Sequence, residues 1–191
     1  MLVNGLYYGD TDERHPGMTA WTAEVSRVIR YCTGRGVDVG AGGRTLRPDT
    51  ITIDRFGGHD IVADAHFIPL KTKSVDFVFS SHCLEHLEFP ERALNEWIRV
   101  AKKWVVVLIP DSRYIDRIGS GREDPEHKFD YTIKSAFDLV QRVRGAELWE
   151  MGYTLWRSSI YFVLLCDNYR PDIDRFEGVP EELIEFYKQG D

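Results

Sequence analysis

One short segment restricts the fold of this chain more than any other. It is an apolar stretch that runs straight into closely spaced glycines, VDVGAGG at residues 37–43. Two further short apolar stretches follow at residues 50–54 and 59–64, and each ends in an aspartate. We predict that each of these three stretches contains a strand, and that residues 74–81 form a fourth strand. A fifth, at residues 104–110, is an unbroken apolar run of the kind that is covered on both faces of a sheet.

Helical periodicity fills several of the intervals between these strands. The predicted helices span residues 19–32, with Thr19 as N-cap, residues 90–103, with Lys102 and Lys103 in the last turn, and residues 132–143. Two more strands are predicted at residues 146–152 and 158–166, and a helical patch at 181–188. Alternating strands and helices favour an α/β fold, here a Rossmann-like, doubly wound, mostly parallel seven-stranded sheet with helices on both faces.

The length of the chain indicates how many domains it forms, and its net charge indicates which partners it can bind. We expect one domain over residues 1–191, with a cofactor half at about 19–110, an acceptor and lid half at about 111–167, and an acidic tail at about 168–191. The net charge of −7 disfavours nucleic acid as the main partner, because phosphate binding needs clustered Lys and Arg. Exposed aromatic residues near the termini could serve a homodimer.

The cellular setting is suggested by what the sequence contains and lacks. Three widely spaced cysteines form no C-x-x-C pair and no complete disulfide framework, which favours a reducing compartment. The first ten residues do not have the pattern of a signal peptide, and the apolar runs are too short to span a bilayer. We therefore expect a cytoplasmic protein that does not insert into a membrane.

The strand ends carry the residues of interest, because ligands of such sheets lie beyond the carboxyl ends of the strands. Gly40 and Gly42 would let the backbone approach a ligand closely, or would only form a tight turn. Asp54 could accept hydrogen bonds from both hydroxyls of a ribose, and Asp64 from an exocyclic amine of a purine. Either acid taken alone could instead cap a turn.

The dinucleotide fingerprint G-x-G-x-x-G is incomplete, because its third glycine would fall at Thr45. The acid at residue 54 also follows Gly40 more closely than that pattern requires. The crossover at residues 44–49 must therefore be shortened, to about one helical turn.

This ordered set of motifs resembles the class I S-adenosylmethionine-dependent methyltransferases of the small, single-domain, type 11-like kind. The resemblance rests on VDVGAGG, TITIDRF, DIVADAHFIPL and the segment SVDFVFSSHCLEHLEFPERALNEWIRVAKKWVVVLIP, and it covers residues 35–110 well. It implies S-adenosylmethionine as the cofactor. The positions that it implies for cofactor binding are Asp38, Gly40, Ala41, Gly42, Asp54, Arg55, Asp64, Ala65, Ser80, Ser81 and His82. The shortened crossover leaves the roles of Gly43 and Arg44 open.

The segment His82-Cys83-Leu84-Glu85-His86 also has the H-x-x-E-H order of inverted zinc proteases. On one helix, His82 and His86 would share a face. A protease would need a third ligand, and the sequence shows no recognisable partner motif. We therefore expect no metal, and we expect His86 to be a hydrogen-bonded packing residue.

Methyl transfer is an in-line displacement, so the protein mainly supplies proximity and orientation. A base helps only for an alcohol, phenol or protonated amine, and His127 and His82 are the candidates, with His86 behind them. Tyr114 and Tyr131 could line the acceptor pocket. The acceptor is expected to be a small molecule, a sugar or another O, N or C nucleophile.

Two alternatives stay open. One is a non-catalytic protein of the same fold that binds the cofactor or a partner. The other is a nicotinamide-dependent oxidoreductase, which the missing third glycine disfavours.

Overall fold

The computed structural model describes residues 2–3, 6–7, 20–113, 125–154 and 158–169. The predictions for Thr19, for Tyr114, for most of the tail and for the helical patch at 181–188 fall outside these residues. None of the helices in the described ranges is long and apolar enough to cross a membrane.

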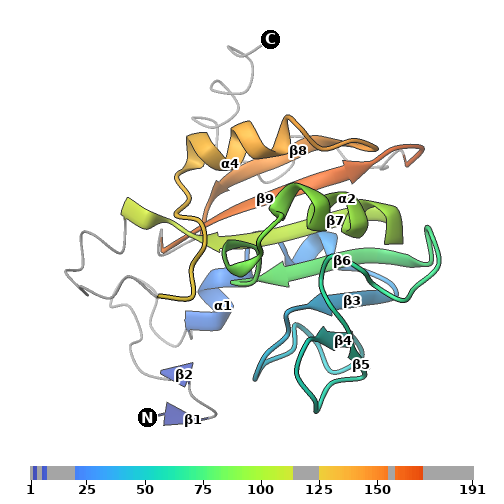
Figure 1. The fold of residues 1–191 in the computed structure, drawn as a ribbon, viewed down its shortest axis with the longest axis horizontal. Coiled ribbons are helices and arrows are strands. Elements are labelled where there is room, and N and C mark those ends of the chain that lie inside the picture. Colours follow the sequence, from blue (N-terminus) through green and yellow to red (C-terminus); the bar gives the residue numbers. More distant parts are fainter. Residues whose placement is uncertain (1, 4–5, 8–19, 114–124, 155–157, 170–191) are drawn as a thin grey trace.

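The core of the molecule is a seven-stranded sheet with the order β5-β4-β3-β6-β7-β9-β8. Its strands are β3 (Gly36–Val39), β4 (Ile51–Asp54), β5 (Ile61–Val62), β6 (Val75–Ser81), β7 (Ala101–Pro110), β8 (Ala146–Tyr153) and β9 (Ser159–Cys166). The sheet runs from β5 at the bottom of Figure 1 to β8 at the top. All strands point the same way except β9, which is antiparallel to both of its neighbours. The predicted mostly parallel α/β sheet is confirmed.

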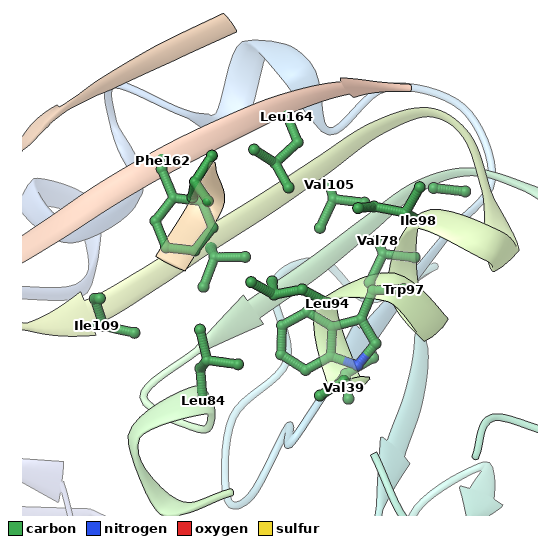
Figure 2. Packing of buried hydrophobic residues seen from close by; sticks show 14 of the residues in the cluster. Val39, Val78, Leu84, Leu94, Trp97, Ile98, Val105, Ile109, Phe162 and Leu164 are labelled. Carbon is green, nitrogen blue, oxygen red and sulfur yellow. The ribbon is translucent and has the colours of Figure 1, made fainter. Parts of the chain in front are cut away.

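Side chains of the long strand β7 alternate between the two faces of the sheet, as a pleated strand requires. Val105, Val107 and Ile109 belong to the cluster that α2 (Pro90–Val100) and α4 (Ile133–Val140) cover. Trp104, Val106 and Leu108 belong to the opposite cluster, beneath α1 (Ala20–Val25) and the 3-10 helix η1 (Ile29–Tyr31). Figure 2 shows Leu94 and Trp97 of α2 among strand residues of the first cluster. A small separate hairpin joins β1 (Leu2–Val3) to β2 (Leu6–Tyr7).

The prediction of one continuous helix over residues 19–32 is wrong. It breaks after Val25 into a turn and then η1. The break lets the Tyr31 side chain turn inward, where its hydroxyl donates to the buried carboxylate of Glu150. Tyr161 donates to the same carboxylate at 2.7 Å. A partner more than a hundred residues away thus overrides the local helical pattern.

The second helix ends earlier than predicted. Lys102 and Lys103 lie in β7, because Ala101 already pairs with Val75 of β6. The Lys103 ammonium then reaches Asp76 at 3.1 Å across the two strands. The pairing strand, and not a helix dipole, sets the position of these cations.

The third helix begins at Ile133, one residue after the predicted start, and Thr132 is its N-cap. The Thr132 side chain accepts from the Ser135 N–H, and the Ser135 hydroxyl accepts from the Thr132 N–H, so both ends of a capping box are present. The helix stops at Val140, three residues before the predicted end. The Phe137 side chain in this helix is 44% exposed.

The crossover between β3 and β4 is shortened further than predicted, since residues 41–50 form turns and no helix. Leu46 is buried in the α1-side cluster and occupies part of the space of the missing helix. The Arg47 guanidinium donates to the carbonyls of Cys32 and Gly34, which ties the crossover to the preceding turn.

Candidate cofactor site at the ends of β3 and β6

The strand order reverses at β3, whose neighbours are β4 on one side and β6 on the other. A pocket of about 350 Å³ lies beyond the carboxyl ends of β3 and β6, the position at which open α/β sheets bind ligands. Its volume falls in the range of small-molecule sites. The lining residues are Trp21, Glu24, Asp38, Gly40, Ala41, Gly42, Gly43, Arg44, Ser81 and His82.

The glycine turn forms one wall of the pocket. Gly40 has a φ of +71° and Gly42 a φ of +53°, values that side-chain-bearing residues rarely adopt. A Cβ on Gly40 would also meet the Cys83 sulfur at 2.4 Å, whereas the space around Gly42 is open. Gly40 is thus required for packing against η2 (Leu84–His86) and its flanking residue, and Gly42 leaves room over the backbone for a ligand.

Asp38 lies at the base of the pocket and is 2% exposed. Its carboxylate accepts from the Leu46 N–H at 2.8 Å, so it holds the shortened crossover in place. Burial raises the pKa of Asp38 to about 7, the Leu46 hydrogen bond opposes this rise, and the nearby Asp54 charge adds to it. A cationic ligand in the pocket would favour the ionised carboxylate.

Asp54 stands at the rim of the pocket. One carboxylate oxygen accepts from the Gly42 N–H at 3.1 Å, and the other from the Phe56 N–H at 3.0 Å. The side chain is only partly buried, and it retains lone pairs for further donors. The predicted ribose-binding acid is therefore fastened to the glycine turn and sits next to the pocket.

Asp54 is not itself among the residues that line the pocket, and four further predicted cofactor residues are also not among them. Asp64 is exposed and accepts from the His66 N–H at 2.8 Å and from the His66 ring, and these contacts lower its pKa. The Ala65 carbonyl accepts from the Trp97 indole at 3.0 Å. Arg55 is exposed and lies over the Phe56 ring, and Ser80 is buried with its hydroxyl donating to the Val39 carbonyl. Cofactor contact stays a prediction for all four.

Two lining residues, Trp21 and Glu24, were not predicted as site residues from the sequence, and Gly43 and Arg44, whose roles were left open, also line the pocket. The Arg44 guanidinium lies 4.6 Å from the centroid of the Trp21 ring. Glu24 comes from the polar side of α1, where a sequence pattern gives no reason to single it out. Its carboxylate contacts His82 at 3.1 Å and the Ser158 hydroxyl at 3.2 Å. Burial raises the pKa of Glu24, but the hydrogen bonds and charge of its partners outweigh burial and lower it overall.

His82 closes the pocket on the β6 side, in the left-handed region with a φ of +52°. Its Nε2 contacts Glu24 and the Ser159 hydroxyl, and its Nδ1 lies 3.6 Å from Glu85. Desolvation lowers the pKa of His82, but the two carboxylates outweigh it and raise the pKa to about 10. A ring that is cationic at neutral pH has no free lone pair, which counts against His82 as the general base.

His127, the other candidate base, is not among the residues that line the pocket. It lies against His86, with ring centroids 4.7 Å apart, and it joins Glu85 and His86 in a cluster whose candidate ligand atoms are all within 4.8 Å of one another. His82 and His86 do not share one helical face, as the zinc-protease alternative would require. Only residues 84–86 are helical, in a 3-10 turn, and His82 lies before it. His86 is hydrogen-bonded, as expected.

The raised pKa of Asp38 gives a pH-dependence that can be checked. Its carboxyl binds a proton more tightly in the folded than in the unfolded chain, so its contribution to the free energy of unfolding falls as pH rises from about 4 to about 7. We expect the Asp38→Asn variant, which keeps the acceptor for Leu46, to gain stability relative to the wild type by a few kcal/mol between pH 5 and pH 8. Urea unfolding at both pH values measures this difference, and parallel pH profiles would contradict it.

The fold and the position of the pocket agree with the resemblance, seen in the sequence, to the class I S-adenosylmethionine-dependent methyltransferases. Residues 35–109 match the model of the methyltransferase domain family. That segment runs from the residue before β3 to the end of β7 and includes the glycine turn and most of the pocket. The match and the fold support S-adenosylmethionine as the cofactor.

Solved structures show the same fold. A SAM-dependent methyltransferase from Thermotoga maritima, described as a possible histamine N-methyltransferase, has 20% identity and a TM-score of 0.61, covering 78% of this chain and 90% of its own. A SAM-dependent methyltransferase from Aquifex aeolicus has 14% identity and a TM-score of 0.55, covering 77% and 93%. Magnesium protoporphyrin IX methyltransferase from Synechocystis PCC 6803, solved with bound SAH, has 11% identity and a TM-score of 0.52, covering 77% and 83%. No curated protein matches the sequence.

Proposed function

We propose that the protein transfers the methyl group of S-adenosylmethionine to an oxygen, nitrogen or carbon nucleophile of a small molecule or sugar. The observation that carries this proposal is the composition of the pocket. A glycine turn with open space over Gly42 lies beside two carboxylates, Glu24 and Asp38, and one guanidinium, Arg44. When bound, the cofactor supplies an activated methyl group on a positively charged sulfur.

The charges of the pocket fit this cofactor. The carboxylates of Glu24 and Asp38 would favour the positive sulfonium and ammonium groups, and Arg44 would favour the carboxylate of the methionine part. Asp54 at the rim would accept from the ribose hydroxyls. Asp64 and Ala65 are proposed to meet the adenine.

The turn between β3 and β4 disfavours the nicotinamide alternative. It has no helix, so no helix N-terminus is available there for the diphosphate of a dinucleotide. The non-catalytic alternative shares the cofactor pocket and differs only in product formation.

The protein would catalyse the reaction by holding the acceptor in line with the methyl group. Of the two bases predicted from the sequence, His82 borders the pocket and His127 does not. An acceptor with a free lone pair would need neither. We further propose that residues 111–167 supply the acceptor side, and that the protein works in the cytoplasm, where Cys32, Cys83 and Cys166 stay reduced.

Methyl transfer is tested by product formation. The purified protein is incubated with S-adenosylmethionine and separate panels of phenols, sugars, amines and carboxylic acids, and S-adenosylhomocysteine is quantified by mass spectrometry. We expect one panel to give S-adenosylhomocysteine, and we expect its amount to equal that of the methylated acceptor. Tight cofactor binding without product in any panel would favour the non-catalytic alternative.

A further inference from the structure

Next to the cofactor pocket, three side chains with metal-binding chemistry meet. Glu85 and His86 come from η2, and His127 comes from the segment that precedes α4. Their candidate ligand atoms all lie within 4.8 Å of one another, and the two imidazole rings meet edge to face at 4.7 Å. His127 thus joins Glu85 and His86 from a position 41 residues after His86 in the chain.

Glu85 is the strongest indication that this cluster holds a cation. Its side chain is 0% exposed, and neither carboxylate oxygen has a hydrogen-bond partner among the described residues. Its nearest basic neighbours, His82 Nδ1 at 3.6 Å and His86 Nε2 at 3.9 Å, are beyond hydrogen-bond distance. A buried carboxylate costs several kcal/mol unless it is both paired and hydrogen-bonded, so a cation bound directly by the carboxylate oxygens would stabilise Glu85.

The environment of His86 leaves its Nε2 available as a ligand atom. The other ring nitrogen, Nδ1, lies 3.2 Å from the Glu126 carbonyl oxygen. A carbonyl can only accept, so the proton sits on Nδ1 and the lone pair of a neutral ring sits on Nε2, toward Glu85. Metal-bound histidines are held in this way, by a hydrogen bond from the second ring nitrogen to a carbonyl or carboxylate.

The backbone keeps the two halves of the cluster together. The N–H groups of Lys128 and Phe129 both donate to the Glu85 carbonyl, at 2.8 Å and 3.2 Å. The segment that carries His127 is thus fastened to the residue that carries the buried carboxylate. The hydroxyl of Tyr131, a few residues further on, is also buried without a hydrogen-bond partner among the described residues.

We propose that Glu85, His86 and His127 form a binding site for a divalent transition-metal ion, with Zn²⁺ as its best probe. Two imidazole nitrogens and one carboxylate oxygen suit Zn²⁺, Co²⁺, Mn²⁺ or Fe²⁺, whereas Mg²⁺ and Ca²⁺ prefer oxygen ligands. Three protein ligands leave at least one position open to another molecule. In this site His127 is a ligand and not the general base expected from the sequence.

The site differs from that of an inverted zinc protease. In that motif both histidines bind the metal. Here the His82 ring is engaged by Glu24 and Ser159, and it lines the cofactor pocket. Its Nδ1 lies 3.6 Å from Glu85, so Glu85 would connect the ion to the lining of the pocket.

The test is a calorimetric titration of the tag-free full chain, stripped with chelator, with ZnCl₂ and separately with MgCl₂. We expect one equivalent of Zn²⁺ to bind and Mg²⁺ to bind far more weakly. His86→Ala and His127→Ala should each weaken Zn²⁺ binding by at least about 100-fold, since loss of a direct ligand should exceed the 10–100-fold effect typical of its outer-shell partners. His59→Ala, which changes a histidine outside the cluster, should bind like the wild type.

Glu85→Gln is a second variant, for the case in which the alanine variants fail to fold. It is isosteric with glutamate and removes only the charge. We expect it to keep the wild-type circular dichroism and a cooperative thermal unfolding in the presence of chelator, and to lose the rise in Tm that Zn²⁺ gives the wild type. Absence of one-equivalent Zn²⁺ binding to the wild type would overturn the proposal, and so would unchanged affinity in the His86 and His127 variants. Protonated histidines alone would then balance the charge of Glu85.

Discussion

Replacement of Asp54 by alanine is expected to weaken S-adenosylmethionine binding by about 100-fold. The proposed contact is a pair of hydrogen bonds from the ribose hydroxyls to a carboxylate, and hydrogen bonds to charged groups each contribute about 1.5–3 kcal/mol. A loss of about 3 kcal/mol corresponds to about two factors of ten in the dissociation constant. The variant also loses the acceptor for the Gly42 N–H, which holds the glycine turn against β4. Calorimetric titration of the folded variant measures the effect.

Asp60→Ala is the matched control for this prediction. Asp60 is an exposed aspartate of the β4–β5 connection that accepts from the Thr52 N–H at 2.9 Å, and it does not line the pocket. Its removal should leave cofactor affinity within about twofold, as expected for a surface change away from the site. If Asp54→Ala bound the cofactor as tightly as Asp60→Ala, the assignment of Asp54 to the ribose would be wrong.

Replacement of Trp97 by alanine is expected to give the largest loss of stability, about 3–5 kcal/mol in the free energy of unfolding. Trp97 is 0% exposed and packs in the cluster between α2 and the sheet (Figure 2). Its indole N–H donates to the Ala65 carbonyl at 3.0 Å, in the segment proposed to meet the adenine. Truncation leaves a cavity and an unpaired carbonyl at once. Urea unfolding followed by far-ultraviolet circular dichroism measures the loss.

Trp97→Phe separates the two contributions. The phenyl ring fills much of the space and cannot donate to Ala65, so this variant should lose only about 1–2 kcal/mol. A loss below about 1 kcal/mol in Trp97→Ala would show that α2 does not depend on this side chain for its docking.

Much of the fold could be predicted because its strands are short, apolar and punctuated by glycine or aspartate. The two failures in the helices have a common cause, which is a partner distant in sequence. Tyr31 turns inward to reach Glu150, and Ala101 leaves the helix to pair with Val75. Neither partner can be seen in a local pattern, and both decide where a helix ends.

The candidate site was only partly predictable for the same reason. Glycines and acids at strand ends have a recognisable order along the chain, so Asp38, Gly40, Gly42 and Asp54 could be named in advance. Glu24 lies in α1, which precedes all of these glycines and acids in the sequence. Only the folded structure shows that it contacts His82, the residue after β6. The cluster of Glu85, His86 and His127 likewise depends on a loop that folds back onto η2.

The central claim is that the pocket at the ends of β3 and β6 binds S-adenosylmethionine, and calorimetric titration tests it most directly. The metal-free protein is titrated with S-adenosylmethionine, with S-adenosylhomocysteine and, as a control, with NADH. The composition of the pocket and the absence of a helix between β3 and β4 predict one-to-one binding of the two sulfur compounds and none of NADH. Binding of NADH alone, or of none of the three, would contradict the assignment of this pocket to the cofactor.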